Sequence, residues 1–226
     1  MPFFIYDSSM LLLIPAFVLA VWAQFRVRST YRKYMSIGSS RGITGAQAAK
    51  YILNLNGIND VDVQPVAGEL SDHYDPSKRV VRLSEKNYHG KSLASLTIAA
   101  HEVGHVIQHY NGYVPLQLRH SILPATNFAS WSAFPLFLIG FFMNIPFLIN
   151  IGIIFFAAVV LFHVVTLPVE FNASNRAIRQ LQNNGMLVAQ EVAGAKKVLN
   201  AAALTYVAAA AMALLQLIRL IILSRN

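Results

Sequence analysis

The sequence contains no cysteine and few charged residues. Without cysteine, neither disulfide bonds nor thiolate ligands are available, so any metal ion must be held by histidine, aspartate or glutamate. Charged residues make up 12% of the 226 residues and apolar residues 55%. This balance is unusual for a soluble globular protein. The composition therefore predicts an integral membrane protein with one or two domains.

Acidic residues are scarce as well, with 10 Asp and Glu against 18 Lys and Arg, which gives a formal net charge of +8. Such an excess is found in nucleic-acid-binding proteins. In a chain with long apolar runs it is better explained by cytoplasmic loops, where Lys and Arg accumulate. We therefore expect a lipid bilayer, and no nucleic acid, as a partner.

Four apolar segments are long enough to cross a membrane. They comprise residues 9–25, 128–148, 149–169 and 201–223. The second and third form one run without Lys, Arg, Asp or Glu, and the turn between them is predicted near Asn144, Pro146 and Asn150. Arg219, near the end of the last segment, is expected to snorkel toward the membrane interface.

The distribution of Lys and Arg predicts how these segments are oriented. None precedes the first segment, twelve lie between Arg26 and Arg119, and four lie in residues 170–200. The positive-inside rule then places both polar regions in the cytoplasm and both termini outside the plasma membrane. The second and third segments would form a hairpin that leaves the cytoplasm and returns to it.

The first polar region, residues 26–127, is predicted to be a folded cytoplasmic domain, and residues 170–200 are predicted to form cytoplasmic helices. Thr44 and Gln47 form a capping box at the start of a helix. Apolar periodicity and turn residues predict a helix over 46–56, a strand over 61–66, a turn and strand within 73–84, and a helix over 92–110. The fold class is thus a mainly α membrane protein with about four transmembrane helices and an α+β domain containing a small sheet.

The helix over 92–110 contains His101-Glu102-Val103-Gly104-His105, which matches the H-E-x-x-H pattern. Residues four apart share one face of a helix, so both imidazoles can reach one zinc ion. Glu102 can address the open coordination position, deprotonate a water there and later protonate the leaving amine. Two histidines and a glutamate are costly in an apolar helix without partners. A zinc site is therefore favoured over chance spacing.

The third zinc ligand must come from elsewhere in the chain. His109 lies about 12 Å along the helix from His101, whereas ligands of one zinc lie about 3–4 Å apart. We expect His109 to face water or to brace a loop at the helix end. The other candidates are Glu170, His73, His89, His120 and His163.

Glu170 is the first charge after the long apolar run and is predicted to open a helix over 170–182. With two spans between them, Glu170 and the HExxH helix would lie on the same side of the membrane. The alternative is a carboxylate that is favoured at a helix N-terminus by the helix dipole. His163 lies inside a predicted span, where a polar contact within the bundle is expected.

The segments HEVGH, LSDHYDPSKRVVRLSE and LPVEFNASNRA resemble the YugP-like membrane zinc metallopeptidases of bacteria. A more distant similarity is to the gluzincin membrane proteases related to the heat-shock protease HtpX and the CAAX prenyl protease. Those proteases carry HExxH and a later E-x-x-A-D helix, which residues 170–174 match at Glu170 and Ala173. The resemblance implies a zincin-like domain, one catalytic zinc ion held by His101, His105 and Glu170, and Glu102 as the general base.

The resemblance also bears on the surroundings of the metal. Ser174 replaces the family's Asp, so Ser174, Asn172 or a backbone carbonyl would have to orient a zinc-binding histidine. In the related proteases the peptide binds as an added strand, and the candidate edge strand here is Arg79, Val80, Val81, Arg82 and Leu83. His73 is a candidate for stabilising the oxyanion, with a turn residue that caps the hairpin as the alternative.

The leading hypothesis is a zinc-dependent endopeptidase that cleaves membrane proteins or their flanking segments at the cytoplasmic face. One alternative is an inactive scaffold or chaperone with a structural zinc, which would need four protein ligands and would leave Glu102 unexplained. Metal transport is a further alternative. It requires ionisable ligands within the spans, where only His163 lies away from the ends.

Overall fold

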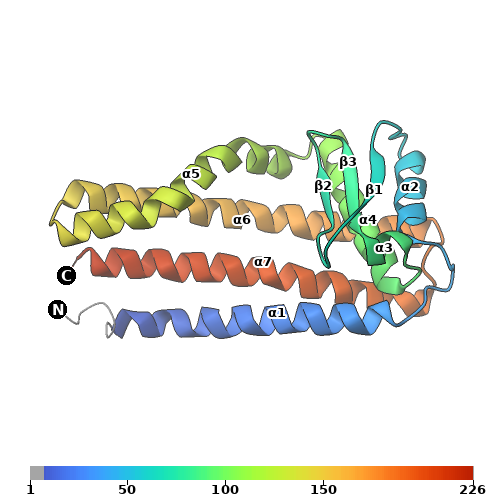
Figure 1. Ribbon diagram of the computed structural model, residues 1–226, viewed down its shortest axis with the longest axis horizontal. Helices are drawn as coiled ribbons and strands as arrows, with labels where there is room; N and C mark the ends of the chain where they lie inside the picture. Colours follow the sequence, from blue (N-terminus) through green and yellow to red (C-terminus); the bar gives the residue numbers. More distant parts are fainter. Residues whose placement is uncertain (1–7, 226) are drawn as a thin grey trace. The chain divides into compact units, whose positions relative to one another are not determined.

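The computed structural model describes residues 8–225, which form helices and one small sheet (Figure 1). In chain order the elements are the 3-10 helix η1 (Ser8–Leu13), α1 (Ile14–Met35), α2 (Gly45–Leu55), β1 (Asp62–Val66), β2 (His73–Asp75), β3 (Val80–Ser84), α3 (Glu85–His89), α4 (Leu93–Tyr110), α5 (Val114–Phe142), α6 (Pro146–Asn183) and α7 (Ala189–Leu223). The chain is thus a mainly α protein with a small sheet, as predicted.

These elements make up two compact units. The membrane unit contains the chain up to Gln24, Gln117–Pro168 and the chain from Leu204 onward. The head unit contains Phe25–Leu116 and Val169–Ala203. Since α1, α6 and α7 each contribute residues to both units, long helices leave one unit and enter the other.

Within residues 8–225, four helices are long and apolar enough to cross a bilayer, and each contributes residues to the membrane unit. They are Ser9–Met35, Val114–Phe142, Pro146–Asn183 and Ala189–Leu223. Large apolar side chains are exposed along them, including Phe17, Trp131, Phe147 and Ile154. Such side chains require lipid around them. The prediction of four spans is confirmed.

The hairpin of α5 and α6 differs in detail from the predicted one. Its turn is at residues 143–145, where Asn144 has a φ of 54°, while Pro146 begins α6 and Asn150 lies within that helix. A Cβ atom on Gly152 would lie 2.8 Å from the Ala133 carbonyl oxygen, so the two helices pack at backbone contact. Small residues therefore set the spacing of the hairpin.

The side chain of Arg219 reaches Ser9, at the start of the first span. This side chain is buried in the membrane unit, at 6% relative exposure, and its Nε donates a hydrogen bond to Ser9 Oγ at 3.3 Å. A charged guanidinium in an apolar bundle needs polar partners. The contact between η1 and α7 supplies one of them.

Two further boundaries differ from the predicted ones. Helix α5 begins at Val114, well before residue 128, because Pro124 is accommodated inside it. Helix α6 continues through Glu170 to Asn183 without a break. Glu170 therefore lies in the interior of a helix, and the alternative role as a helix N-terminal carboxylate does not apply.

In the head unit the strand order is β1-β3-β2, with β1 parallel and β2 antiparallel to β3. One face of the sheet packs against α2 and α4. It contributes Val63, Val81 and Leu83 to the hydrophobic core. The predicted capping box of Thr44 and Gln47 is present at the start of α2. This core holds α4, the helix that carries the HExxH motif, against the sheet.

Candidate metal centre

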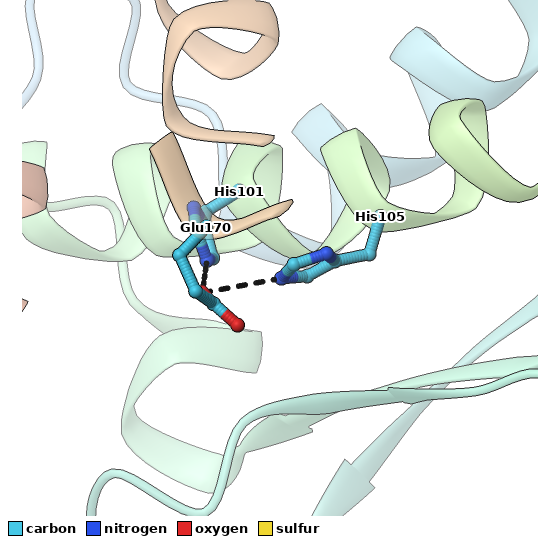
Figure 2. A group of neighbouring side chains, drawn as sticks. All are labelled: His101, His105 and Glu170. Atoms are coloured by element: carbon cyan, nitrogen blue, oxygen red, sulfur yellow. Dashed lines mark ion pairs between the residues drawn. The ribbon is translucent and has the colours of Figure 1, made fainter. Parts of the chain in front are cut away.

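Three side chains from two helices of the head unit converge on one point. On α4, the rings of His101 and His105 lie 4.8 Å apart between centroids. Their Nε2 atoms lie 3.4 Å and 3.6 Å from the same carboxylate oxygen, Oε2 of Glu170 on α6 (Figure 2). The structure therefore brings together the three residues named as ligands from the sequence.

The spacing of these atoms fits a metal ion. Ligands that are 2.0–2.1 Å from a tetrahedral zinc lie about 3.3 Å from one another, which is close to both measured distances. One nitrogen from each histidine and one carboxylate oxygen lie within 4.8 Å of one another. In residues 8–225 the group has three members, and three protein ligands are typical of a catalytic zinc site with one open position.

Gly104, inside the HExxH motif, allows α6 to approach α4 closely. A Cβ atom at Gly104 would lie 2.6 Å from the Ala173 carbonyl oxygen and 3.2 Å from its Cα atom. Ala173 is completely buried and Glu170, one helical turn before it, is 3% exposed. The absence of a side chain at position 104 therefore helps to place the Glu170 carboxylate beside the histidines.

Gln108 orients His105, a role that the sequence analysis missed. Its Oε1 lies 3.0 Å from His105 Nδ1, and its Nε2 donates to the Val169 carbonyl oxygen at 2.8 Å and to Asn172 Oδ1 at 3.0 Å. Because both Nε2 protons are used as donors, Oε1 accepts from Nδ1–H of His105. The lone pair of His105 then lies on Nε2, toward Glu170.

Ser174 contacts the other histidine. Its Oγ lies 3.2 Å from His101 Nδ1, so the hydroxyl contacts a candidate metal ligand. Asn172 is not hydrogen-bonded to His101 or His105. Its Oδ1 accepts hydrogen bonds from Gln108 Nε2 and, at 2.7 Å, from Arg176 Nε. Ser174 thus acts directly on a candidate ligand, and Asn172 acts through Gln108.

Burial and charge set the proton affinity of the acidic and basic groups on α4. Burial raises the pKa of Glu102, and the carboxylates of Asp72 and Glu170 raise it further, against the lowering effect of His101 and His105. Burial alone would lower the pKa of His105, but the Glu170 and Glu102 carboxylates raise it overall. A buried carboxylate with a raised pKa is suited to accepting a proton.

The predicted edge strand is wrong. Val80–Ser84 form β3, which is the central strand and is paired on both sides, and Arg79 precedes it with a φ of 50°. Val81 and Leu83 are fully buried in the core. The edge that borders α4 belongs to β2, because Tyr74 Oη lies 2.9 Å from Nδ1 of His109. The same contact shows that His109 braces strand β2 rather than a loop.

The structure does not support the oxyanion role of His73. Neighbouring residues of a strand point to opposite faces, and Tyr74 points toward α4. His73 therefore points to the other face, where its Nδ1 lies 2.8 Å from the Ser71 carbonyl oxygen and its Nε2 lies 3.3 Å from Arg82. Arg82 also forms an ion pair with Asp75. His73 is the exposed member of this polar cluster, in which Arg82 and Asp75 are half-buried.

Comparison with known proteins covers nearly the whole chain. Residues 9–225 match a family described as "Putative neutral zinc metallopeptidase". The chain is 50% identical over 215 residues to a protein of Bacillus subtilis (strain 168) named "Putative membrane protease YugP", covering 95% of this chain and 96% of that protein. No solved structure is significantly similar to the chain. Both units and all three candidate ligands fall within the matched residues.

Proposed function

The chain belongs to the neutral zinc metallopeptidase family, and we propose that it is a membrane-embedded endopeptidase that hydrolyses peptide bonds at the cytoplasmic face of the plasma membrane. The observation that carries the proposal is the convergence of His101, His105 and Glu170 beside Glu102. It supplies three zinc ligands and a buried base in one place. The expected substrates are membrane proteins or the segments that flank their spans.

The proposed roles follow from the position of each side chain. His101, His105 and Glu170 would hold the zinc ion, which would supply Lewis-acid chemistry for the scissile carbonyl and the attacking water. Glu102 accepts a proton from that water and later donates it to the leaving amine. Its buried position favours the protonated state that the second step requires.

Two residues position the ligands. Gln108 holds His105 with Nε2 toward the metal position and at the same time binds the Val169 carbonyl, next to Glu170. Ser174 holds His101 from α6. Both ligating histidines are therefore oriented by contacts that involve α6, which is also the helix that carries the third ligand.

The proposed peptide-binding edge is β2 rather than β3. A peptide can extend a sheet by pairing with the backbone of an edge strand, and β2 is the edge strand linked to α4 through Tyr74 and His109. This hydrogen bond would keep the edge at a fixed distance from the helix that carries His101 and His105.

Two observations disfavour a scaffold with a structural zinc. The metal group in residues 8–225 has three protein ligands, whereas structural zinc sites usually have four. A buried carboxylate beside the metal group, Glu102, costs stability and is unexplained by a structural role. Cytoplasmic orientation of the head unit is supported by the Lys and Arg distribution.

Replacement of Glu102 by Gln tests the proposal. The full-length variant should retain zinc, because no ligand is removed, but proteolysis should fall by about 10²–10⁴-fold, the usual contribution of a general base. Zinc content is measured by mass spectrometry of the metal. Activity is measured as the accumulation of uncleaved membrane proteins in cells and as cleavage of a protein substrate by the purified enzyme.

Glu69→Gln is the matched control, because Glu69 is exposed and forms a surface ion pair with Lys86. It should keep both zinc and activity. Undiminished proteolysis by Glu102→Gln would remove Glu102 as the base, and absence of proteolysis in the wild-type protein with full zinc content would favour the scaffold.

A further inference from the structure

A cleft in the head unit is lined by residues of α6 and α7. Its volume is about 390 Å³. The polar side chains that line it include Ser174, Asn175, Arg179, Gln182, Lys196 and Asn200. Each of them carries a hydrogen-bond donor, and none is acidic. The cleft is therefore suited to an anion.

The two cations of the cleft have no carboxylate to neutralise them. Within residues 8–225, neither Arg179 nor Lys196 takes part in an ion pair or a hydrogen bond. The two acids of the same polar region are engaged elsewhere: Glu170 with the histidines, and Glu191 with Ser40. The positive charge of the cleft is thus free to attract a ligand.

The helices that form the cleft are also membrane-spanning helices. Along α7, Asn200 precedes the first membrane-unit residue, Leu204, by four positions, and along α6 Ser174 follows Pro168 by six. At 1.5 Å per residue these separations are about 6 Å and 9 Å. The headgroup layer is about 5–8 Å thick on each side of the hydrocarbon core. Asn200 and Ser174 thus lie about one headgroup layer beyond the membrane unit. Lys196 and Arg179 are eight and eleven positions from Leu204 and Pro168, about 12 Å and 16 Å along the helices, so their long side chains must reach back toward the headgroups.

We propose that this cleft binds the phosphate headgroup of an anionic phospholipid, with Arg179 and Lys196 as the charged contacts. Long basic side chains can keep their stems on the helix surface while their heads meet the phosphate. Ile178 and Leu199 form the floor of the cleft but are themselves buried in the core. The preference for a lipid over a free anion therefore rests on the continuation of α6 and α7 into the membrane unit. The binding itself does not depend on the proposed peptidase activity.

The bound lipid would also touch a residue of the metal centre. Ser174 lines the cleft, and its Oγ lies 3.2 Å from His101 Nδ1. A lipid that restricts Ser174 would hold His101 in its zinc-binding orientation. Anionic lipid should therefore increase zinc affinity, a consequence that rests on the proposed metal site.

The test uses full-length protein in detergent micelles to which phosphatidylglycerol or phosphatidylcholine is added, with bound lipid counted by native mass spectrometry. Each basic residue near a membrane surface contributes about fivefold to binding of anionic lipid. The double variant Arg179→Gln, Lys196→Gln should therefore bind phosphatidylglycerol about 25-fold more weakly. Phosphatidylcholine binding should be weak and unchanged by the substitutions.

Lys197→Gln provides the matched control, because Lys197 is exposed on the same helix but does not line the cleft. Its loss of phosphatidylglycerol binding should be clearly smaller than the loss of about fivefold expected for Lys196→Gln, because Lys197 does not line the cleft. Equal losses in Lys196→Gln and Lys197→Gln would overturn the proposal in favour of general surface charge. Displacement of phosphatidylglycerol by millimolar inorganic phosphate would overturn it in favour of a free-anion site.

Zinc affinity, measured by chelator competition with and without phosphatidylglycerol, tests the link to His101. An increase in wild type that is lost in Ser174→Ala supports the link. Lipid binding without any change in zinc affinity would refute the proposed effect of the lipid on His101, although the lipid-binding proposal itself would stand.

Discussion

Helices α4 and α6 contribute to the metal centre in opposite ways. Helix α4 provides His101, Glu102 and His105 within five consecutive residues, so their relative positions follow from helix geometry alone. Helix α6 provides Glu170, whose position depends on a membrane hairpin and on backbone packing against Gly104. The α4 residues of the site are positioned by helix geometry, and the α6 residue is positioned by tertiary packing. Substitutions that move or remove Glu170 on α6 should therefore lower zinc affinity while the histidines of α4 keep their relative positions.

The largest effect on metal binding is expected for Glu170→Ala, which removes the contribution of α6. Zinc affinity should fall by more than about 100-fold, beyond the range for residues that only orient a ligand. Chelator competition on the purified protein measures it. Asn183→Ala, an exposed change on the same helix, is the control and should have no effect. Unchanged zinc content in Glu170→Ala would mean that the third ligand lies elsewhere.

Gly104→Ala should weaken the site without altering any ligand. The added methyl group would collide with the Ala173 carbonyl at 2.6 Å, so α6 and its Glu170 must move away from α4. We expect zinc affinity to fall about 10–100-fold, as for other disturbances around a metal ligand, and stability to fall by about 1–3 kcal/mol from overpacking. Zinc competition and thermal unfolding of the metal-free protein measure the two effects.

Gly38→Ala is the matched control for this change, because nothing lies within 4 Å of a Cβ atom at Gly38. It should leave zinc affinity unchanged. If Gly104→Ala binds zinc as tightly as Gly38→Ala does, the close approach of the two helices is not what positions Glu170.

Gln108→Ala and Ser174→Asp should change zinc affinity in opposite directions. Gln108→Ala removes the acceptor for His105 Nδ1–H, and a loss of about 10-fold or more is expected. Ser174→Asp gives His101 a carboxylate partner, which strengthens a ligating imidazole. A cobalt-substituted protein reports both changes through its visible spectrum. Equal zinc affinity in all three proteins would show that the histidines need no partner on Nδ1.

The smallest effect on the metal is expected for His109→Ala. This residue binds Tyr74 on β2 rather than the metal ligands, so zinc affinity should stay within about twofold of wild type. If β2 binds the peptide, KM should rise while kcat changes little, because uniform substrate binding is weakened. Steady-state kinetics with a cleaved peptide separate these outcomes. A loss of zinc in His109→Ala would contradict its assignment outside the metal centre.

The same distinction between local and packed features explains what could be predicted from the sequence. The four spans and the HExxH helix depend on apolar runs and on helix periodicity, which are local, and both were predicted. The order β1-β3-β2 depends on pairing between distant segments, so β3 was mistaken for an edge strand. The face occupied by His73 could not be known until β2 was placed beside α4.

Gln108 was missed although a local signal was present. It lies three residues after His105, on the same face of the helix, and follows the apolar pair Val106 and Ile107. Its partners on α6, Val169 and Asn172, are distant in sequence. Its role in joining the two helices therefore becomes visible only in the folded protein.

The unbroken course of α6 has a mechanical consequence. A zinc ion held by His105 and Glu170 would close a ring of chain that contains α5 and the part of α6 up to Glu170. Such a closure acts like a crosslink and reduces the entropy of the unfolded chain. The ion would thus stabilise the packing of the α5–α6 hairpin. Its removal by a chelator should lower the stability of the hairpin as well as abolish the proposed peptidase activity.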